Sequence, residues 1–224
     1  MGEVIEFERP DVGRCPAYLA KSSSVGGPSI VVIQEWWGLN DQIKRTADRF
    51  AEAGFNALAP DLFRGKGARY GEQSEASHLM SGLNFIDAAE QDVRGAVQYL
   101  KQESAKVGVT GFCMGGALTI VAAVKVPEMD AGACFYGVPP PQIADSRSIA
   151  IPMIYHFADR DDWVTPKVVS DLETAVEGSK SAHTIYRYDA EHAFMNEARP
   201  EVYDAALAKT AWDRTLDFFK KTLG

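Results

Sequence analysis

Residues 107–116 read Val107-Gly-Val-Thr-Gly-Phe-Cys-Met-Gly-Gly116, an apolar run that ends in the pattern G-x-C-x-G. Many hydrolases carry this pattern with serine at its centre, on a sharp strand-to-helix turn that holds a nucleophile over the end of a parallel sheet. The glycines Gly111 and Gly115 would keep such a turn free of Cβ clashes, because the nucleophile itself takes a strained conformation. The pattern favours a catalytic Cys113, but these ten residues alone also fit a structural cysteine in an ordinary strand–glycine–helix corner.

Strand-like and helix-like segments alternate along the chain, which is typical of a mostly parallel sheet with helices on both faces. The clearest strand is residues 29–34, because a continuous β-branched run suits a strand that is buried on both faces. Further strands are expected at residues 55–59, 106–110, 131–136, 152–157 and 183–188, with one or two edge strands in residues 1–20. Helices are expected at residues 41–53, 88–102 and 117–124, from Pro166 onward, and at 200–222. Residues 61–76, polar and glycine-rich, are expected to form a mobile segment over a site. The predicted fold class is α/β, with a single domain over residues 1–224.

The composition limits the function classes. With 224 residues, of which 46% are hydrophobic, the chain can bury the core of one large domain. No apolar run reaches membrane-spanning length, and the N-terminus lacks the basic-then-apolar pattern of a signal peptide. Three cysteines are too few for a disulfide framework, and a formal net charge of −8 argues against a phosphate-binding surface. We therefore expect a cytoplasmic protein whose partners include neither nucleic acid nor membrane. The oligomeric state stays undecided, with a monomer favoured.

Four candidate functional residues follow predicted strands or turns, namely Glu35, Cys113, Asp161 and His192. In open α/β sheets, functional groups gather where loops leave the carboxyl ends of the strands. The order cysteine, aspartate, histidine is also the nucleophile–acid–histidine order of the α/β-hydrolase fold. The joint pattern therefore predicts a Cys–His–Asp site.

The histidine and the acid each have a local context. His192 lies just past the last predicted strand, where an imidazole can take a proton and return it to a leaving group. Asp161 stands three residues before Val164, a spacing that suits the acid loop in which an aspartate orients the imidazole. Its neighbours Asp159 and Asp162 are interpreted as solvated or salt-bridged loop residues.

Other residues near these positions have two interpretations each. Glu35 directly follows a fully apolar strand, where an unpaired carboxylate would be costly, so it is either functional or an ion-paired loop residue. The aromatic residues beside the candidates can line an apolar pocket or pack in the core. They are Trp36, Trp37, Trp163 and Phe194. Cys15 and Cys134 are expected to behave as small buried hydrophobes.

Six motifs occur in order and at suitable spacing along nearly the whole chain. They are Gln34-Glu-Trp-Trp-Gly-Leu-Asn40, Pro60-Asp-Leu-Phe63, Gly111-Phe-Cys-Met-Gly-Gly116, Phe135-Tyr-Gly137, Asp161-x-x-Val164 and Glu191-His-Ala-Phe194. Together they resemble the dienelactone hydrolase (carboxymethylenebutenolidase) family of the α/β-hydrolase superfamily. The resemblance implies a single-domain α/β-hydrolase fold.

The resemblance also implies roles for individual residues. Cys113, His192 and Asp161 would form the triad, and Glu35 would contact the resting thiol and reorient on substrate binding to help form the thiolate. The backbone N–H groups of Met114 and Trp36 would form the oxyanion hole, where fixed donors meet the developing negative charge.

One departure from the family concerns the substrate. Dienelactone-cleaving members grip the substrate carboxylate with arginines, one of them four residues after the catalytic histidine, where this chain has Asn196. A second family arginine falls near Ser74. Asparagine cannot provide the bidentate recognition that a guanidinium gives. Arg64, Arg69 or Arg199 could substitute from nearby loops, although each also fits a solvated surface charge.

These observations predict a cysteine-dependent hydrolase of lactones or small carboxylic esters that forms an acyl-enzyme and needs no metal or cofactor. One alternative is a general esterase on neutral activated esters without dienelactone activity. Another is a non-catalytic module that binds a small molecule. Glutamine amidotransferases also use a G-x-C-x-G turn, but they carry glutamate two residues after the histidine, where this chain has Phe194.

Overall fold

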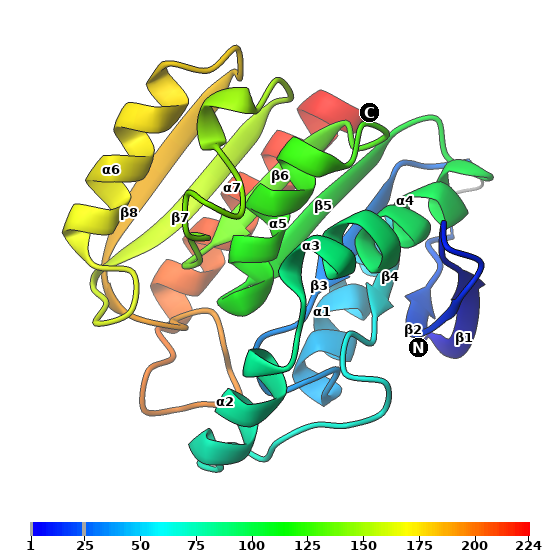
Figure 1. Ribbon diagram of the computed structural model, residues 1–224, viewed down its shortest axis with the longest axis horizontal. Helices are drawn as coiled ribbons and strands as arrows, with labels where there is room; N and C mark the ends of the chain where they lie inside the picture. Colours follow the sequence, from blue (N-terminus) through cyan, green and yellow to red (C-terminus); the bar gives the residue numbers. More distant parts are fainter. Residues whose placement is uncertain (1, 24–25) are drawn as a thin grey trace.

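The computed structural model describes residues 2–23 and 26–224, and its strands form one sheet in the order β1-β2-β4-β3-β5-β6-β7-β8 (Figure 1). The strands are β1 (Glu3–Glu8), β2 (Arg14–Ala20), β3 (Ser29–Ile33), β4 (Asn56–Pro60), β5 (Val107–Phe112), β6 (Ala131–Phe135), β7 (Met153–Arg160) and β8 (His183–Glu191). β2 pairs antiparallel with β1 and with β4, and all the other neighbouring strands pair in parallel. The predicted α/β class is confirmed.

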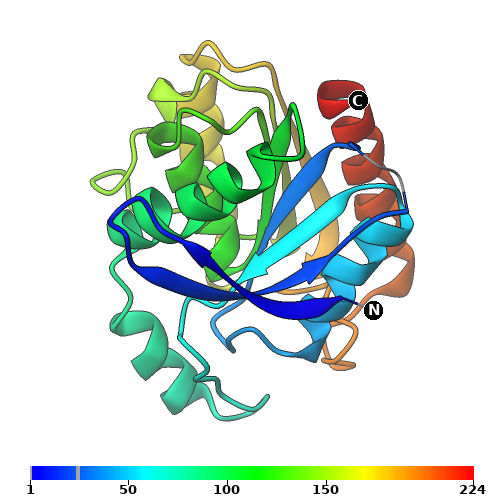
Figure 2. The ribbon, with the colours of Figure 1, turned by 90° about the vertical axis from the view of Figure 1, so that its right-hand side faces the viewer.

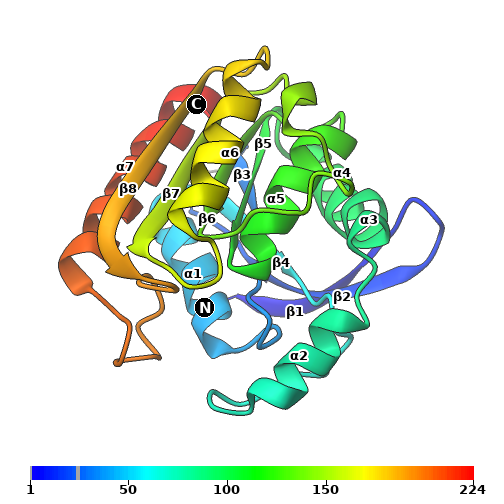
Figure 3. The same cartoon turned by 60° about the vertical axis from the view of Figure 1, so that its left-hand side comes forward.

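Helices cover both faces of this sheet, as Figure 3 shows. They are α1 (Asp41–Glu52), α2 (Gln73–Ser81), α3 (Phe85–Asp87), the π-helix η1 (Ala88–Val93), α4 (Arg94–Lys101), α5 (Met114–Lys125), the 3-10 helix η2 (Ser146–Ser148), α6 (Pro166–Glu177) and α7 (Ala205–Leu223). α1 and α7 pack on one face through Phe50, Trp212 and Phe219. α4, α5 and α6 pack on the other face, where Val97, Leu118 and Val169 belong to a second core.

The strands at the centre of the sheet form because their residues suit burial on both sides. Every residue of β3, β4, β5 and β6 is buried, as the β-branched run at residues 29–33 predicted. α5 is buried continuously from Met114 to Ala122, and its small side chains let it lie close to the sheet. This packing fixes the N-terminus of α5 directly above the end of β5.

The N-terminal segment, for which one or two edge strands were predicted, forms an antiparallel hairpin at the edge of the sheet, drawn in dark blue in Figure 2. β1 is the edge strand, and β2 lies inside it, between β1 and β4. The hairpin therefore extends the sheet on the side away from β7 and β8.

The segment at residues 61–76 is largely exposed, as its polar composition predicted, but it begins with buried residues and ends in a helix. Leu62 and Phe63 are buried, and the Asp61 carboxylate accepts hydrogen bonds from the N–H groups of Phe63 (3.1 Å) and Gly65 (2.6 Å). Regular structure begins again at Gln73, with α2. The segment thus begins with a turn in which Asp61 satisfies two backbone donors, and it ends in a helix. Its mobility stays a prediction.

Two predicted helices also have different limits. The helix predicted at 88–102 begins at Phe85 and passes through the π-turn η1 before α4. The last helix begins at Ala205 rather than near residue 200, because the Asp204 side chain caps it by accepting from the N–H groups of Ala206 and Leu207. The residues freed from that helix form a loop that lies with α2 at the same end of the sheet (Figure 1).

Candidate active site

Cys113 occupies the turn between β5 and α5 in a conformation that few side chains adopt. Its φ is 55° and its ψ −115°, and its N–H donates to the Phe135 carbonyl (3.0 Å). A Cβ on Gly111 would overlap the Gly115 carbonyl oxygen, and one on Gly115 would come within 2.5 Å of the Gln34 carbonyl oxygen. The two glycines of the G-x-C-x-G pattern are therefore required by close backbone approach, and the half-buried thiol is held above the sheet.

His192 and Asp161 meet at this end of the sheet from β8 and β7. Nδ1 of His192 lies 2.6 Å from Oδ2 of Asp161, whose side chain is fully buried. The other carboxylate oxygen accepts from the N–H groups of Trp163 (2.7 Å) and Val164 (2.9 Å). Burial alone would raise the pKa of Asp161, but the hydrogen bond with His192 and the two N–H donors outweigh it and lower the pKa. Asp161 is thus an ionised partner for the imidazole.

The charge of His192 depends on both of its neighbours. Burial lowers the pKa of His192, but the negative charge of Cys113 and the hydrogen bonds with Asp161 and Cys113 raise it to about 10. The imidazole thus interacts with the sulfur of Cys113 and with the carboxylate of Asp161. This arrangement can supply an imidazolium–thiolate pair, the reactive form of a cysteine nucleophile.

Glu35 is buried beside these residues, and both of its oxygens are occupied. Oε1 accepts from the Tyr136 hydroxyl (3.2 Å), and Oε2 accepts from the Asn196 amide (2.8 Å). Burial raises the pKa of Glu35, although the charge of His192 and the amide of Asn196 oppose that effect. Among the described residues no hydrogen bond joins Glu35 to Cys113, so the implied contact with the resting thiol stays a prediction.

Strained backbone marks the same end of the sheet. Besides Cys113, Tyr136 has a φ of 37° and Ala193 a φ of 67°, and they follow β6 and β8. Such conformations persist where the surrounding structure imposes them, which is common at functional sites. The Tyr136 ring meets His192 edge-on at 5.1 Å, so it contacts both His192 and Glu35. Tyr136 was not among the functional residues predicted from the sequence, although the motif Phe135-Tyr-Gly137 contains it.

A cavity of about 490 Å³ opens above Cys113 and His192. Of the predicted pocket residues, Trp36, Trp37, Trp163 and Arg199 line it, together with Met114. The Trp36 ring packs edge-on against Trp37 (5.1 Å) and Trp163 (5.5 Å), and Trp163 is 66% exposed. These rings form a continuous aromatic wall from the buried end of the cavity to solvent.

Besides Arg64, three residues predicted to line the pocket lie elsewhere. Phe194 is fully buried and packs against Tyr136 and Tyr188 in the core. Asn196 is also fully buried, and its amide donates a hydrogen bond to the carboxylate of Glu35. Arg69 is exposed and lies outside the cavity lining. The prediction is corrected for all three.

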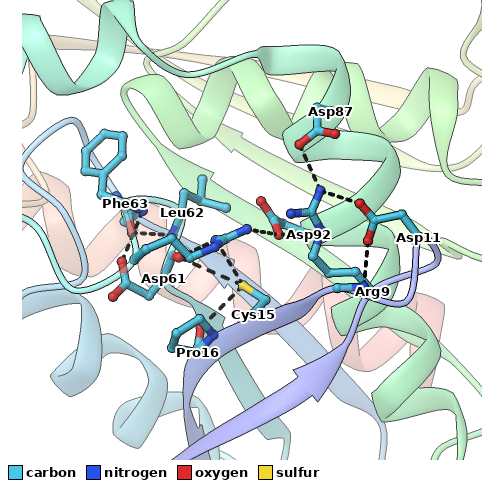
Figure 4. Close-up of polar contacts among 12 residues, drawn as sticks. Arg9, Asp11, Cys15, Pro16, Asp61, Leu62, Phe63, Asp87 and Asp92 are labelled. Carbon is cyan, nitrogen blue, oxygen red and sulfur yellow. Dashed lines mark hydrogen bonds and ion pairs between the residues drawn. The ribbon is translucent and has the colours of Figure 1, made fainter.

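Arg64 belongs to a separate polar cluster with Cys15, Asp61 and Asp92, which Figure 4 labels. Its guanidinium donates to the Asp92 carboxylate (2.6 Å), to the Asp61 carbonyl (2.7 Å) and to Sγ of Cys15 (3.4 Å). Asp92 is buried and also pairs with Arg9 (3.3 Å). Arg64 is therefore directed away from the cavity, and Cys15 is a buried acceptor of a hydrogen bond as well as a small core residue.

The predicted oxyanion hole stays a prediction, although its first donor is well placed. Met114 is the first residue of α5. The first N–H groups of a helix have no partner within the helix and carry its positive dipole end. Trp36 follows β3, three residues after its end at Ile33. Both N–H groups thus belong to segments that leave the carboxyl ends of adjacent strands.

In residues 2–23 and 26–224, no group of three or more His, Cys, Asp or Glu side chains could hold a metal ion. Over the same residues, no helix has both the length and the apolar character needed to cross a membrane.

Comparison with known proteins places the chain in a family. The sequence model of the dienelactone hydrolase family matches residues 15–223. The chain is 38% identical to Protein usf of Aquifex pyrophilus, with 100% of both chains covered, and 27% identical to carboxymethylenebutenolidase 1 of Cupriavidus pinatubonensis, with 97% of this chain and 96% of the relative covered.

A solved structure supports the fold. The crystal structure of a dienelactone hydrolase-like promiscuous phosphotriesterase from metagenomic libraries matches with a TM-score of 0.77 at 22% identity, covering 100% of this chain and 99% of the other. At that identity the likeness concerns the fold alone. The chain therefore belongs to the dienelactone hydrolase family, and it is a hydrolase of carboxylic esters or lactones built on the α/β-hydrolase fold.

Proposed function

We propose that the chain hydrolyses lactones or small carboxylic esters through an acyl-enzyme on Cys113, with His192 and Asp161 completing the triad. One observation carries the proposal. Cys113 and His192 line the same apolar cavity, and Nδ1 of His192 lies 2.6 Å from Oδ2 of the buried Asp161. A charged imidazole between a thiolate and a carboxylate is the arrangement that nucleophilic acyl transfer needs.

In the acylation step the sulfur of Cys113 attacks the carbonyl carbon of the ester and forms a C–S bond. The carbonyl oxygen becomes an oxyanion, which the N–H groups of Met114 and Trp36 would stabilise. The tetrahedral intermediate then collapses, the C–O bond breaks, and the leaving alcohol takes the proton of His192. The product of this step is a thioester, with the alcohol released or, for a lactone, kept on the same molecule.

In the deacylation step the neutral His192 takes a proton from water, and the hydroxide attacks the thioester carbonyl. The oxyanion forms again, the C–S bond breaks, and the carboxylic acid leaves. Asp161 keeps the proton on Nδ1, so that Nε2 stays free to act as the base. The sulfur leaves as a thiolate beside the imidazolium, and transfer of one proton between them restores the resting thiol and the neutral imidazole.

Glu35 would act before acylation rather than within it. We propose that its carboxylate helps to ionise the thiol after the substrate binds, as the family resemblance implies. Its contacts with Tyr136 and Asn196 hold it in the buried position from which it would move. A thiol that is fully activated only in the substrate complex would be protected from oxidation at rest.

The experiment is a burst and trapping assay with 4-nitrophenyl acetate. The proposal expects a burst of one equivalent of 4-nitrophenol per active chain, and a mass increase of one acetyl group on the peptide that contains Cys113. Cys113→Ala should lose both, whereas Cys134→Ala, which removes another buried thiol, should keep both. A non-catalytic binding module would give no burst. Turnover that survives in Cys113→Ala would overturn the nucleophile assignment.

A further inference from the structure

The cavity wall carries almost no charge. Trp36, Trp163, Phe85 and Ile143 represent its apolar and aromatic majority. Besides the candidate catalytic His192, the described lining residues include two with a formal charge, Arg199 and Glu201. The charge of a substrate that this cavity accepts is therefore decided at those two side chains.

Arg199 and Glu201 are already paired with each other. Nε of Arg199 donates to Oε1 of Glu201 at 2.8 Å. The Arg199 side chain is 21% exposed and that of Glu201 is 59% exposed. A hydrogen bond to its own backbone and the bond from Arg199 lower the pKa of Glu201, so its carboxylate is ionised at neutral pH. The guanidinium also lies 5.9 Å from the centre of the Trp37 ring, at the aromatic wall.

A carboxylate on the substrate would compete for this guanidinium with a carboxylate that the protein supplies. It would also enter a cavity that offers mainly apolar surface, where a charge without a partner is costly. An uncharged ester meets neither obstacle and gains from burial against the aromatic wall. The pair therefore penalises anionic substrates in two ways.

We propose, resting on the hydrolase function above, that the Arg199–Glu201 pair makes this site select uncharged apolar esters or lactones, with Glu201 masking Arg199 against substrate carboxylates. Glu201 is then a specificity-determining residue, and Arg199 is an anion site that the wild-type enzyme keeps occupied.

The test compares two aryl acetates of nearly equal shape, the uncharged 4-acetoxybenzamide and the anionic 4-acetoxybenzoate. For each variant, the readout is the ratio of kcat/KM for the anionic ester to that for the uncharged one. Comparing this ratio between variants cancels the intrinsic difference in leaving-group reactivity. Glu201→Gln should raise the ratio about tenfold, which corresponds to roughly 1.4 kcal/mol. The double variant Arg199→Gln with Glu201→Gln should lose that gain.

Glu197→Gln is the matched control. Glu197 lies on the same loop and pairs with Arg45 at 3.1 Å, but it does not line the cavity. The substitution Glu197→Gln removes the same unit of negative charge, so it reports the general electrostatic effect on the kcat/KM ratio. That effect should be less than about twofold, because charges near the surface are screened. An equal rise in Glu197→Gln and Glu201→Gln, or no rise in Glu201→Gln, would overturn the proposal.

Binding separates this proposal from the proposed reaction. In a Cys113→Ala background, tryptophan fluorescence would measure the affinity for the products 4-hydroxybenzamide and 4-hydroxybenzoate. Glu201→Gln should shift the affinity ratio toward the anion by a similar factor. If that shift occurs while no variant turns over either ester, the reaction fails and the selectivity stands. If turnover occurs without any shift in either ratio, only the selectivity fails.

Discussion

Replacing Asp161 by asparagine removes one charge and leaves the shape of the site intact. An amide oxygen at Oδ1 can still accept from the N–H groups of Trp163 and Val164, so the acid loop should keep its fold. At the other position the carboxylate oxygen, 2.6 Å from Nδ1 of His192, becomes an NH₂ group that can only donate. Nδ1 must then accept, and the single ring proton moves to Nε2, on the side of Cys113.

The magnitude follows from these two changes. A hydrogen bond to a charged group is worth about 1.5–3 kcal/mol, which corresponds to about 10- to 150-fold in rate at 1.36 kcal/mol per tenfold. The wrong tautomer adds to this loss because Nε2 can no longer act as the base in deacylation, and a comparable substitution in a serine triad lowers kcat about 10⁴-fold. We therefore expect Asp161→Asn to lower kcat by roughly 10²- to 10⁴-fold.

The assay is steady-state and burst kinetics with 4-nitrophenyl acetate, together with urea unfolding at neutral pH. Asp159→Asn, at the end of β7, and Asp162→Asn, in the loop that follows, are the matched controls. Asp159 pairs with Arg187 at 2.8 Å on the surface, so Asp159→Asn should lower the activity only slightly. The reasoning about tautomer and charge is refuted if either control loses as much kcat as Asp161→Asn. It is also refuted if Asp161→Asn keeps near-normal deacylation.

Two further predictions concern buried groups. Glu35→Gln should lower kcat/KM about tenfold or more without destabilising the fold, because it removes a buried carboxylate that would help to ionise the thiol. Stopped-flow measurement of acylation tests this expectation, and an unchanged acylation rate would exclude that role. His156 is fully buried between Phe135 and Tyr186, and burial lowers its pKa to about 3. It therefore stabilises the fold above its unfolded pKa of about 6.5, and this stability is lost as the pH falls toward 3, by about 2 kcal/mol between pH 7 and pH 5. Urea unfolding at the two pH values should show this loss in the wild type and less of it in His156→Gln; an equal loss in both would contradict the assignment.

The parts of the site that the sequence predicted are those encoded within a few residues. The turn at Cys113 could be predicted from one short stretch of sequence, because its glycines, the strand before them and the helix after them are continuous in the chain. The spacing from Asp161 to Val164 likewise matches the hydrogen bond that the structure shows between them. The contact that requires Gly111 lies within the turn at Cys113, at the Gly115 carbonyl, whereas the contact that requires Gly115 comes from the Gln34 carbonyl of a distant segment. The glycine pattern could therefore be recognised locally, although part of its cause lies elsewhere in the fold.

The parts that could not be predicted depend on contacts between distant segments. Asn196 was placed on the pocket wall because of its distance from His192 along the chain, but it donates to Glu35, 161 residues away. Arg64 was considered for the substrate because it lies on a loop near the site, yet Asp92 on η1 holds it elsewhere. No motif or spacing in the sequence indicates that Glu35 pairs with Asn196 or that Asp92 pairs with Arg64.

The position of Asn196 has a consequence for the charge balance of the whole site. Glu35 has a neutral amide as its nearest partner, so the positive charges that oppose the burial effect on its pKa are those of His192 and, more weakly, Arg199. Arg199 is shared with Glu201 at the cavity rim. One guanidinium thus serves both the buried carboxylate and the selection of substrate charge. A substrate carboxylate that took Arg199 would also weaken the support for ionised Glu35, and an uncharged ester leaves that support in place.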